Sequence, residues 1–205
     1  MSWVAHLGWQ RGVSALAFTT LLAWGAIQAL SDEPEIALVI GEPWEDMRQR
    51  SSARIGTAIP EKISFSIPKS DARLHFIDPQ YGFVTPLARF FTVGYGRDAL
   101  IDGVRMSPQI EPLLLDDTLK VVLDLQDQLR KGGWKPIRTQ DSPSFADTPE
   151  WRNQLRNRTR AGIAYWQASD KYQVMLLVNR FKDRKRPTEE RYLITLALAT
   201  PWVNP

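Results

Sequence analysis

The sequence predicts an α+β domain, built mainly from antiparallel sheet with two or three packed helices and preceded by one N-terminal hydrophobic helix. Three features lead to this prediction. Segment 12–30 is apolar and has no charged residue, segment 113–133 has apolar residues at helical spacing, and the last third of the chain holds three apolar runs separated by polar turns. Strand-like segments outnumber helical ones, which favours a sheet packed against a few helices.

The N-terminal segment predicts that the chain is exported. Gln28 is the only strongly polar side chain within 12–30, and the segment is close to the ~20 residues that a helix needs to cross a bilayer. Arg11 precedes it, whereas the first charged residues after it, Asp32 and Glu33, are acidic. This asymmetry places the N-terminus in the cytoplasm and the remainder of the chain in the periplasm.

Two interpretations of this segment remain open at the sequence level. Small residues at 29 and 31 resemble a signal-peptidase site, which would release a soluble periplasmic product. The apolar run exceeds the usual length of the apolar region of a signal peptide, which favours a retained anchor in the inner membrane. We therefore interpret 1–31 as a signal anchor or signal peptide and 32–205 as a single periplasmic α+β domain, single-pass if the segment is retained.

Composition narrows the classes of function. Hydrophobic residues make up 43% and charged residues 24% of the 205-residue chain, which is typical of a globular protein. The chain has no cysteine, which excludes disulfides, thiol catalysis and thiolate metal sites. The formal net charge of +3 favours an acidic partner over a basic one.

Short strands and one short helix are predicted before the long helix. Residues 35–41 form a buried strand, and Pro43 begins a helix with acidic residues first and basic residues last. Alternating apolar residues in 62–68 and 73–78 indicate half-buried strands. The Asp102-Gly103 pair predicts a tight hairpin turn, because such turns need residues that tolerate positive φ.

Segment 113–133 is the clearest helix in the sequence. Asp116 or Asp117 is predicted to cap its first turn, and Gly132 ends it. One continuous apolar face is formed by Leu115, Leu119, Val122, Leu125 and Leu129.

The final third predicts a short helix and a three-stranded antiparallel meander. Thr148 caps the helix and Pro149 occupies its first position. The strands are 161–168, 172–181 and 191–199. The last two are rich enough in apolar residues to predict a sheet partly covered on both faces.

Catalytic signals are scarce. His75 is the only histidine beyond the N-terminal segment, no nucleophile-elbow motif is present, and the Asp116-Asp117 pair is explained by helix capping. We therefore predict that the protein is not an enzyme and needs no metal or cofactor. The alternative from another class is a periplasmic hydrolase that uses His75 with Asp78 or another carboxylate.

Aromatic residues are predicted to serve packing instead of carbohydrate stacking. The tryptophans after the N-terminal segment lie where helix–sheet contacts are expected: Trp44, Trp134, Trp151, Trp166 and Trp202.

Basic residues form the most distinctive surface feature. In the helix they recur every four residues, which places them on one face, and in the loop before the last strand they crowd together. A solvated surface is the plain explanation. The more specific explanation is that these residues bind an anionic partner, either an acidic protein or lipid headgroups. Export argues against nucleic acid as that partner. The predicted partner-binding residues are Arg152, Arg156, Arg160, Lys182, Arg184, Lys185 and Arg186.

These observations predict an exported, membrane-anchored protein-binding domain, which resembles bacterial envelope proteins such as immunity proteins only in general style. An inhibitor of an envelope-targeting toxin fits this description. A structural component of an envelope assembly is the alternative among non-enzymes.

Overall fold

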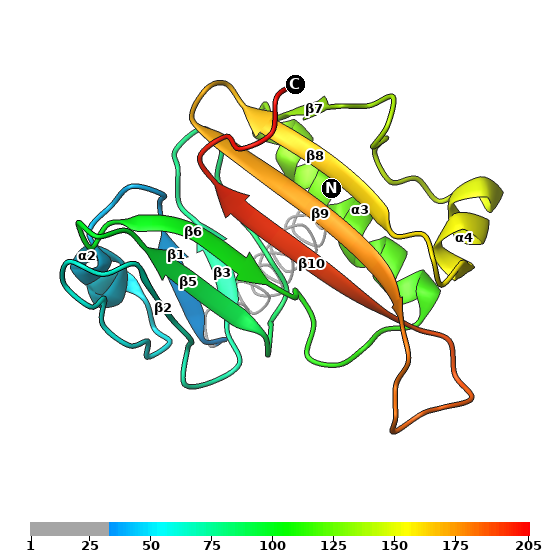
Figure 1. Cartoon of the computed structure of the whole chain (residues 1–205), viewed down its shortest axis with the longest axis horizontal. Coiled ribbons are helices and arrows are strands. Elements are labelled where there is room, and N and C mark those ends of the chain that lie inside the picture. The colour runs from blue at the N-terminus through cyan, green and yellow to red at the C-terminus, as the bar shows by residue number, and fades with distance from the viewer. Residues whose placement is uncertain (1–32) are drawn as a thin grey trace, which may run out of the picture. The chain divides into compact units, whose positions relative to one another are not determined.

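Two sheets and the helices α2–α4 make up residues 33–205, the part of the chain that the computed structural model describes (Figure 1). The predicted predominance of antiparallel sheet with few helices is confirmed. The hydrophobic segment 12–30 and the proposed boundary after residue 31 lie outside the described residues. No helix in 33–205 has the length and apolar character needed to cross a bilayer.

The larger sheet has seven strands, all paired antiparallel. Its last three strands in sequence are neighbours, so the predicted meander is confirmed, and Ser169 adopts a positive φ of 53° in the tight turn between the first two. From one edge to the other the strands are β2 (Ser64–Ser66), β5 (Phe91–Tyr95), β6 (Ile101–Met106), β10 (Arg191–Ala199), β9 (Tyr172–Phe181), β8 (Gly162–Ala168) and β7 (Lys135–Ile137).

The smaller sheet contains a parallel pair that the sequence did not predict. β1 (Glu35–Leu38) runs parallel to β3 (Arg73–Phe76), and β4 (Phe83–Val84) pairs antiparallel with β3. Parallel neighbours need a long crossover between them. Here the crossover contains helix α2 (Trp44–Arg50) and strand β2, which belongs to the other sheet.

Helix α3 (Leu115–Lys131) covers one face of the larger sheet and contacts both β10 and β4. In Figure 1 it lies behind β8, β9 and β10, and none of the helices α2–α4 lies in front of these strands. We call the front surface the open face. Helix cover is therefore one-sided, with α3 behind the sheet and α4 (Pro149–Arg156) in contact with β9. The prediction of a sheet partly covered on both faces fits the open face as well, where alternate residues of β10 are half-buried and Gln173 binds the C-terminal segment.

Burial along the strands follows this one-sided cover. In β10 the residues that face α3 are buried, whereas alternate residues such as Leu193 and Ala197 are only half-buried. Met175 and Leu177 continue the same apolar surface on β9. The open face thus stays apolar although none of the helices α2–α4 covers it, which is unusual for an exposed sheet surface.

The apolar face of α3 is confirmed residue by residue, because its five predicted members are all buried. Its cap was predicted wrongly. Leu114 occupies the N-cap position. Asp116 and Asp117 lie in the first turn, where their negative charges interact favourably with the helix dipole but do not cap the helix. The Oγ1 of Thr118 donates to the Leu114 carbonyl and strengthens this turn. The predicted Thr148 cap of α4 is confirmed, since its hydroxyl accepts from the Trp151 N–H.

The hairpin turn predicted at Asp102-Gly103 is also wrong, because both residues lie within β6. The turn comes earlier, where the N–H of Ala99 donates to the carbonyl of Gly96 and Ala99 has a φ of 61°. The Asp98 carboxylate accepts the Leu100 N–H and supplies the turn chemistry. Gly103 instead leaves part of the sheet surface free of side chains.

Glutamine side chains hold irregular backbone in place by donating to a carbonyl and accepting an N–H at the same time. Gln173 binds Val203 in this way and ties the C-terminal segment to β9. Gln126, which is fully buried, binds both backbone groups of Phe145. Local sequence patterns do not predict these contacts, because each glutamine binds a residue distant in sequence.

Two edge strands of the sheets, β1 and β7, are protected against pairing with another chain. On the outer edge of β1, the N–H groups of Glu35 and Ala37 donate to the hydroxyls of Ser52 and Ser51. The edge strand β7 carries an exposed proline, Pro136, which cannot donate a hydrogen bond. Such features disfavour edge-to-edge pairing with another chain.

Candidate functional site

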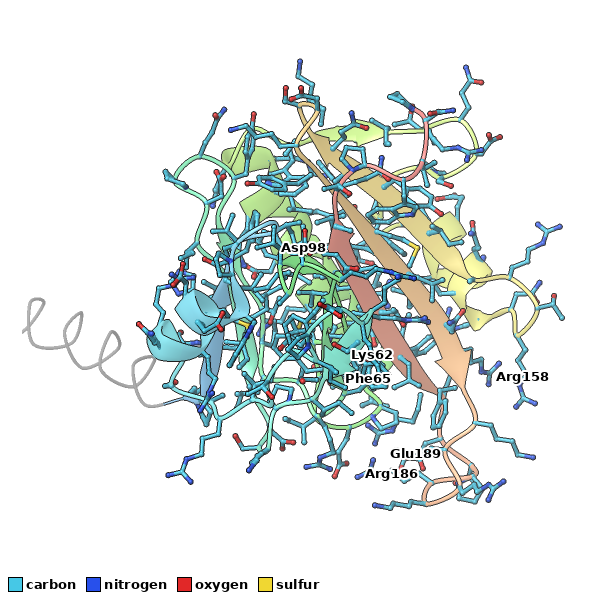
Figure 2. All side chains as sticks on the ribbon, turned by 60° about the vertical axis from the view of Figure 1, so that its left-hand side comes forward. Lys62, Phe65, Asp98, Arg158, Arg186 and Glu189 are labelled. Atoms are coloured by element: carbon cyan, nitrogen blue, oxygen red, sulfur yellow. The ribbon has the colours of Figure 1, made fainter. Side chains whose placement is uncertain are left out.

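The two basic clusters predicted from the sequence meet at one end of the larger sheet. The guanidinium Nε of Arg156, at the end of α4, lies 3.4 Å from the carboxylate of Glu190, at the base of the β9–β10 loop. Arg180 on β9 donates to the Arg156 carbonyl and joins the two elements further. Figure 2 shows Arg186 and Glu189 on the loop as it extends away from the sheet, and Arg158 on the segment after α4. We call this region the basic end.

One detail of the prediction is wrong. α4 ends at Arg156, so Arg160 does not share a helix face with Arg152 and Arg156. Asn157 leaves the helix in an extended conformation, and its side chain then accepts from both the N–H and the hydroxyl of Thr159. This local side-chain bonding ends the helix in place of another turn.

Three of the seven predicted basic residues are held by carboxylates. Arg152 contacts Asp147 at 2.5 Å and Asp116 at 2.6 Å, and Arg156 contacts Glu190. Arg186 lies 2.5 Å from Glu111, and hydrogen bonding from this guanidinium lowers the pKa of Glu111. These arginines fasten α3, α4 and the loop to one another and are only partly available to a partner.

The other four basic residues are exposed, and within the described chain no carboxylate lies in ion-pair distance of them. They are Arg160, Lys182, Arg184 and Lys185.

The loop that carries three of these cations has a defined shape. Asp183 is only 7% exposed, and its carboxylate accepts the Lys185 N–H at 2.8 Å and lies 3.5 Å from the Arg186 guanidinium. This organising aspartate was missed in the sequence, where it is hidden among the basic residues of the loop. Its position as the one acidic residue among the cations of 182–186 was the only local signal.

The residues of the hydrolase alternative have separate partners. The Nδ1 of His75 lies 3.6 Å from the Glu35 carboxylate, and the imidazole is 41% exposed. Asp78 accepts the N–H groups of Gln80 and Tyr81, and the hydroxyl of Tyr172 donates to it at 3.2 Å. Asp78 therefore shapes a turn and a buried aromatic contact.

The pKa values agree with this structural role for Asp78. Partial burial opposes ionisation, but the hydrogen bonds from Tyr81, Gln80 and Tyr172 outweigh it and hold the pKa of Asp78 below its ordinary value. Burial, followed by the charge of Asp78, raises the pKa of Tyr172 to about 12. A general base near neutral pH needs a raised carboxylate pKa, which is the opposite direction. Across 33–205 no cluster of His, Asp and Glu has the arrangement of a metal site.

A second surface was not predicted at all. An apolar groove of about 600 Å³ lies on the open face across β2, β5, β6 and β10. Its walls are large, exposed side chains, and its floor is made of glycine and alanine. The walls are Phe65, Ile67, Phe90 and Trp202, and the floor includes Gly94, Gly103, Ala197 and Ala199.

Trp202 corrects the prediction that the tryptophans serve packing. Trp166 and Trp134 are buried, and Trp44 and Trp151 are half-buried, as expected. Trp202 is 45% exposed and lines the groove, because Gln173 anchors the C-terminal segment on the open face. The alternation of Ile63, Phe65 and Ile67 was the available signal for the other wall, but it was interpreted as a half-buried strand.

Comparison with known proteins identifies no related family. No protein-family model, no curated protein and no solved structure matches the chain.

Proposed function

We propose that the protein is an exported domain, anchored in the inner membrane through residues 12–30, that works by binding an acidic protein partner at its basic end. Inhibition of an envelope-targeting toxin, as in immunity proteins, is the activity that fits this description. The single observation that carries the proposal is a loop of defined shape that presents three cations, Lys182, Arg184 and Lys185, with no carboxylate of residues 33–205 in ion-pair distance.

The energetics of this loop favour a role outside the fold. Like charges placed close together repel one another and add nothing to the stability of the domain. Neighbouring arginines form ion pairs with Glu111 and Glu190, whereas in the described part of the chain none of these three cations forms one. Exposed cations of this kind accelerate the encounter with an acidic partner and set its salt dependence.

Charge reversal at the basic end should weaken the binding of the partner. We expect the triple substitution Lys182→Glu, Arg184→Glu and Lys185→Glu to lower partner recovery about tenfold or more at low salt, because each reversal replaces attraction by repulsion. The melting temperature should change little, because these side chains make no ion pair in the fold. The measurement is quantitative mass spectrometry of proteins captured from membranes with the full-length chain, at low and high salt.

The matched control reverses three exposed lysines elsewhere on the domain, Lys120, Lys135 and Lys171. This variant has the same net charge as the first, so a general effect of charge would weaken capture equally in both. Equal recovery from the two variants, or recovery that ignores salt, would contradict a specific role for the basic end.

The anchor is tested separately. If residues 12–30 are retained, the protein should keep its full mass and stay in the membrane pellet after alkaline carbonate extraction. A soluble product that begins at Asp32 would instead identify a cleaved signal peptide. A reporter fused after Pro205 that is active only in the cytoplasm would contradict the proposed orientation.

A further inference from the structure

We propose that the groove on the open face is a homodimer interface, in which a second copy of this chain packs face to face around a two-fold axis. This inference is independent of the proposed function, because the basic end and the groove use different residues. It rests on the shape, the charge and the area of the groove, together with the protected sheet edges at β1, β4 and β7.

The groove has the shape of a surface that receives large side chains. Gly94 and Gly103 face each other across β5 and β6, and Ala197 and Ala199 continue the floor on β10. A side chain at Gly103 would approach the Leu198 carbonyl to 3.2 Å. The floor is therefore low both because its residues are small and because there is little room for a larger side chain at this position. In a two-fold pair, each copy offers both a low floor and an aromatic wall that can fill the floor of the other.

The charges in the groove favour a second copy over an acidic or a basic partner. Arg105 and Asp102 both line the groove and are exposed, and neither belongs to an ion pair in the part of the chain described here. An acidic partner would meet Asp102, and a basic partner would meet Arg105. A second copy related by a two-fold axis brings Arg105 to Asp102 twice, once on each side of the axis.

Asp102 would be stabilised by the Arg105 of a second copy. Its carboxylate lies over Gly94, so close that a side chain at Gly94 would stand 2.5 Å from the carboxylate oxygen. Although the residue is exposed as a whole, partial burial of its carboxylate, followed by the charge of the nearby Asp98, raises the pKa of Asp102. A guanidinium from the other copy would replace the lost hydration.

The exposed walls of the groove supply part of the area that a stable interface needs. A large apolar side chain exposes roughly 150–250 Å², so the four half-exposed walls of the groove offer on the order of 400 Å². A stable interface buries about 800 Å² from each partner. The remainder can come from the adjoining open face, where Met175, Leu177 and Leu193 are half-buried.

At three of the four sheet edges, those of β1, β4 and β7, pairing with another chain is disfavoured. Serine side chains occupy the outer N–H groups of β1, and Gln128 binds both backbone groups of Val84 on β4. Pro136 interrupts the β7 edge. Association through a face is therefore favoured over strand addition.

The absence of cysteine makes the proposal directly testable. In the full-length chain, Thr92→Cys or Ala197→Cys places a single thiol on the open face within the groove. A short, flexible bis-maleimide should link each of these variants into a covalent dimer. Lys120→Cys, exposed on α3 behind the sheet, is the matched control and should remain monomeric.

The charge argument has its own test. Arg105→Asp and Asp102→Arg should each lower the dimer yield of the groove cysteine roughly tenfold or more, because each creates two like-charged contacts. Mixing the two variants, with different tags, should restore the yield in the mixed pair. Unchanged melting temperatures show that the variants are folded.

Two results would overturn the dimer. In the first, the groove cysteines react with a simple maleimide but form no more dimer than Lys120→Cys. In the second, they are protected from the maleimide without forming a dimer, which would show that a different molecule covers the open face.

Discussion

Replacing Trp166 by alanine is expected to lower the free energy of unfolding by about 3–5 kcal/mol, because it leaves a large cavity in the core. Trp166 lies on β8, is fully buried and carries the Arg130 guanidinium 5.3 Å from its ring centre. Its indole N–H has no hydrogen-bond partner in the structure, so the loss is one of packing. Since domains of this size have only about 5–15 kcal/mol to lose, the variant should be close to unfolding at growth temperature.

The measurement is urea denaturation followed by circular dichroism, with Trp202→Ala as the control. Trp202 is 45% exposed and should lose far less. Comparable losses in the two variants would show that Trp166 is not a central core residue and would contradict the packing described here.

Replacing Gln109 by alanine is expected to lower the free energy of unfolding by about 2–3 kcal/mol, since a buried N–H left without an acceptor costs about 1–3 kcal/mol and further bonds are lost as well. The Gln109 side chain accepts the Ile194 N–H at 2.8 Å and donates to the carbonyls of Tyr192 and Glu111. It thereby continues the contact between β6 and β10 beyond the end of β6 at Met106.

Gln140 provides the matched control, because it is exposed and lies in the loop after β7. Gln140→Ala should be nearly neutral under the same denaturation. Hydrogen exchange gives a finer readout, since the amide of Ile194 should lose protection selectively in Gln109→Ala. Retained protection at Ile194 would show that another acceptor replaces the glutamine.

The two predictions address different parts of the same problem. Trp166 tests the apolar packing that alternation along a strand already indicates. Gln109 tests a polar contact between residues 85 positions apart, to which no local pattern points. The glutamine contacts of the fold belong to this second class, and so does Asp183 in the basic end.

In the candidate sites, too, the features with a local sequence signal were predicted and those that depend on distant segments were not. The sequence located the basic residues, and the structure brings Arg156 to the base of the loop that carries Lys182 and Lys185. Which cations are paired could not be predicted, because Glu111 reaches Arg186 from a distant segment. The groove was missed because its walls come from residues as far apart as Phe65 and Trp202.

Sequence alone determined the elements whose signal is periodic and local. The face of α3 from Leu115 to Leu129, the Thr148 cap and the meander β8–β10 were all predicted, because spacing along the chain dictates which side chains share a surface. Tertiary structure alone decided the parallel pairing of β1 with β3, the uncovered face of the larger sheet and the pairing of each arginine. These depend on which distant segments meet, and the free energy of such contacts is set by packing and desolvation between segments, on which local spacing carries no information.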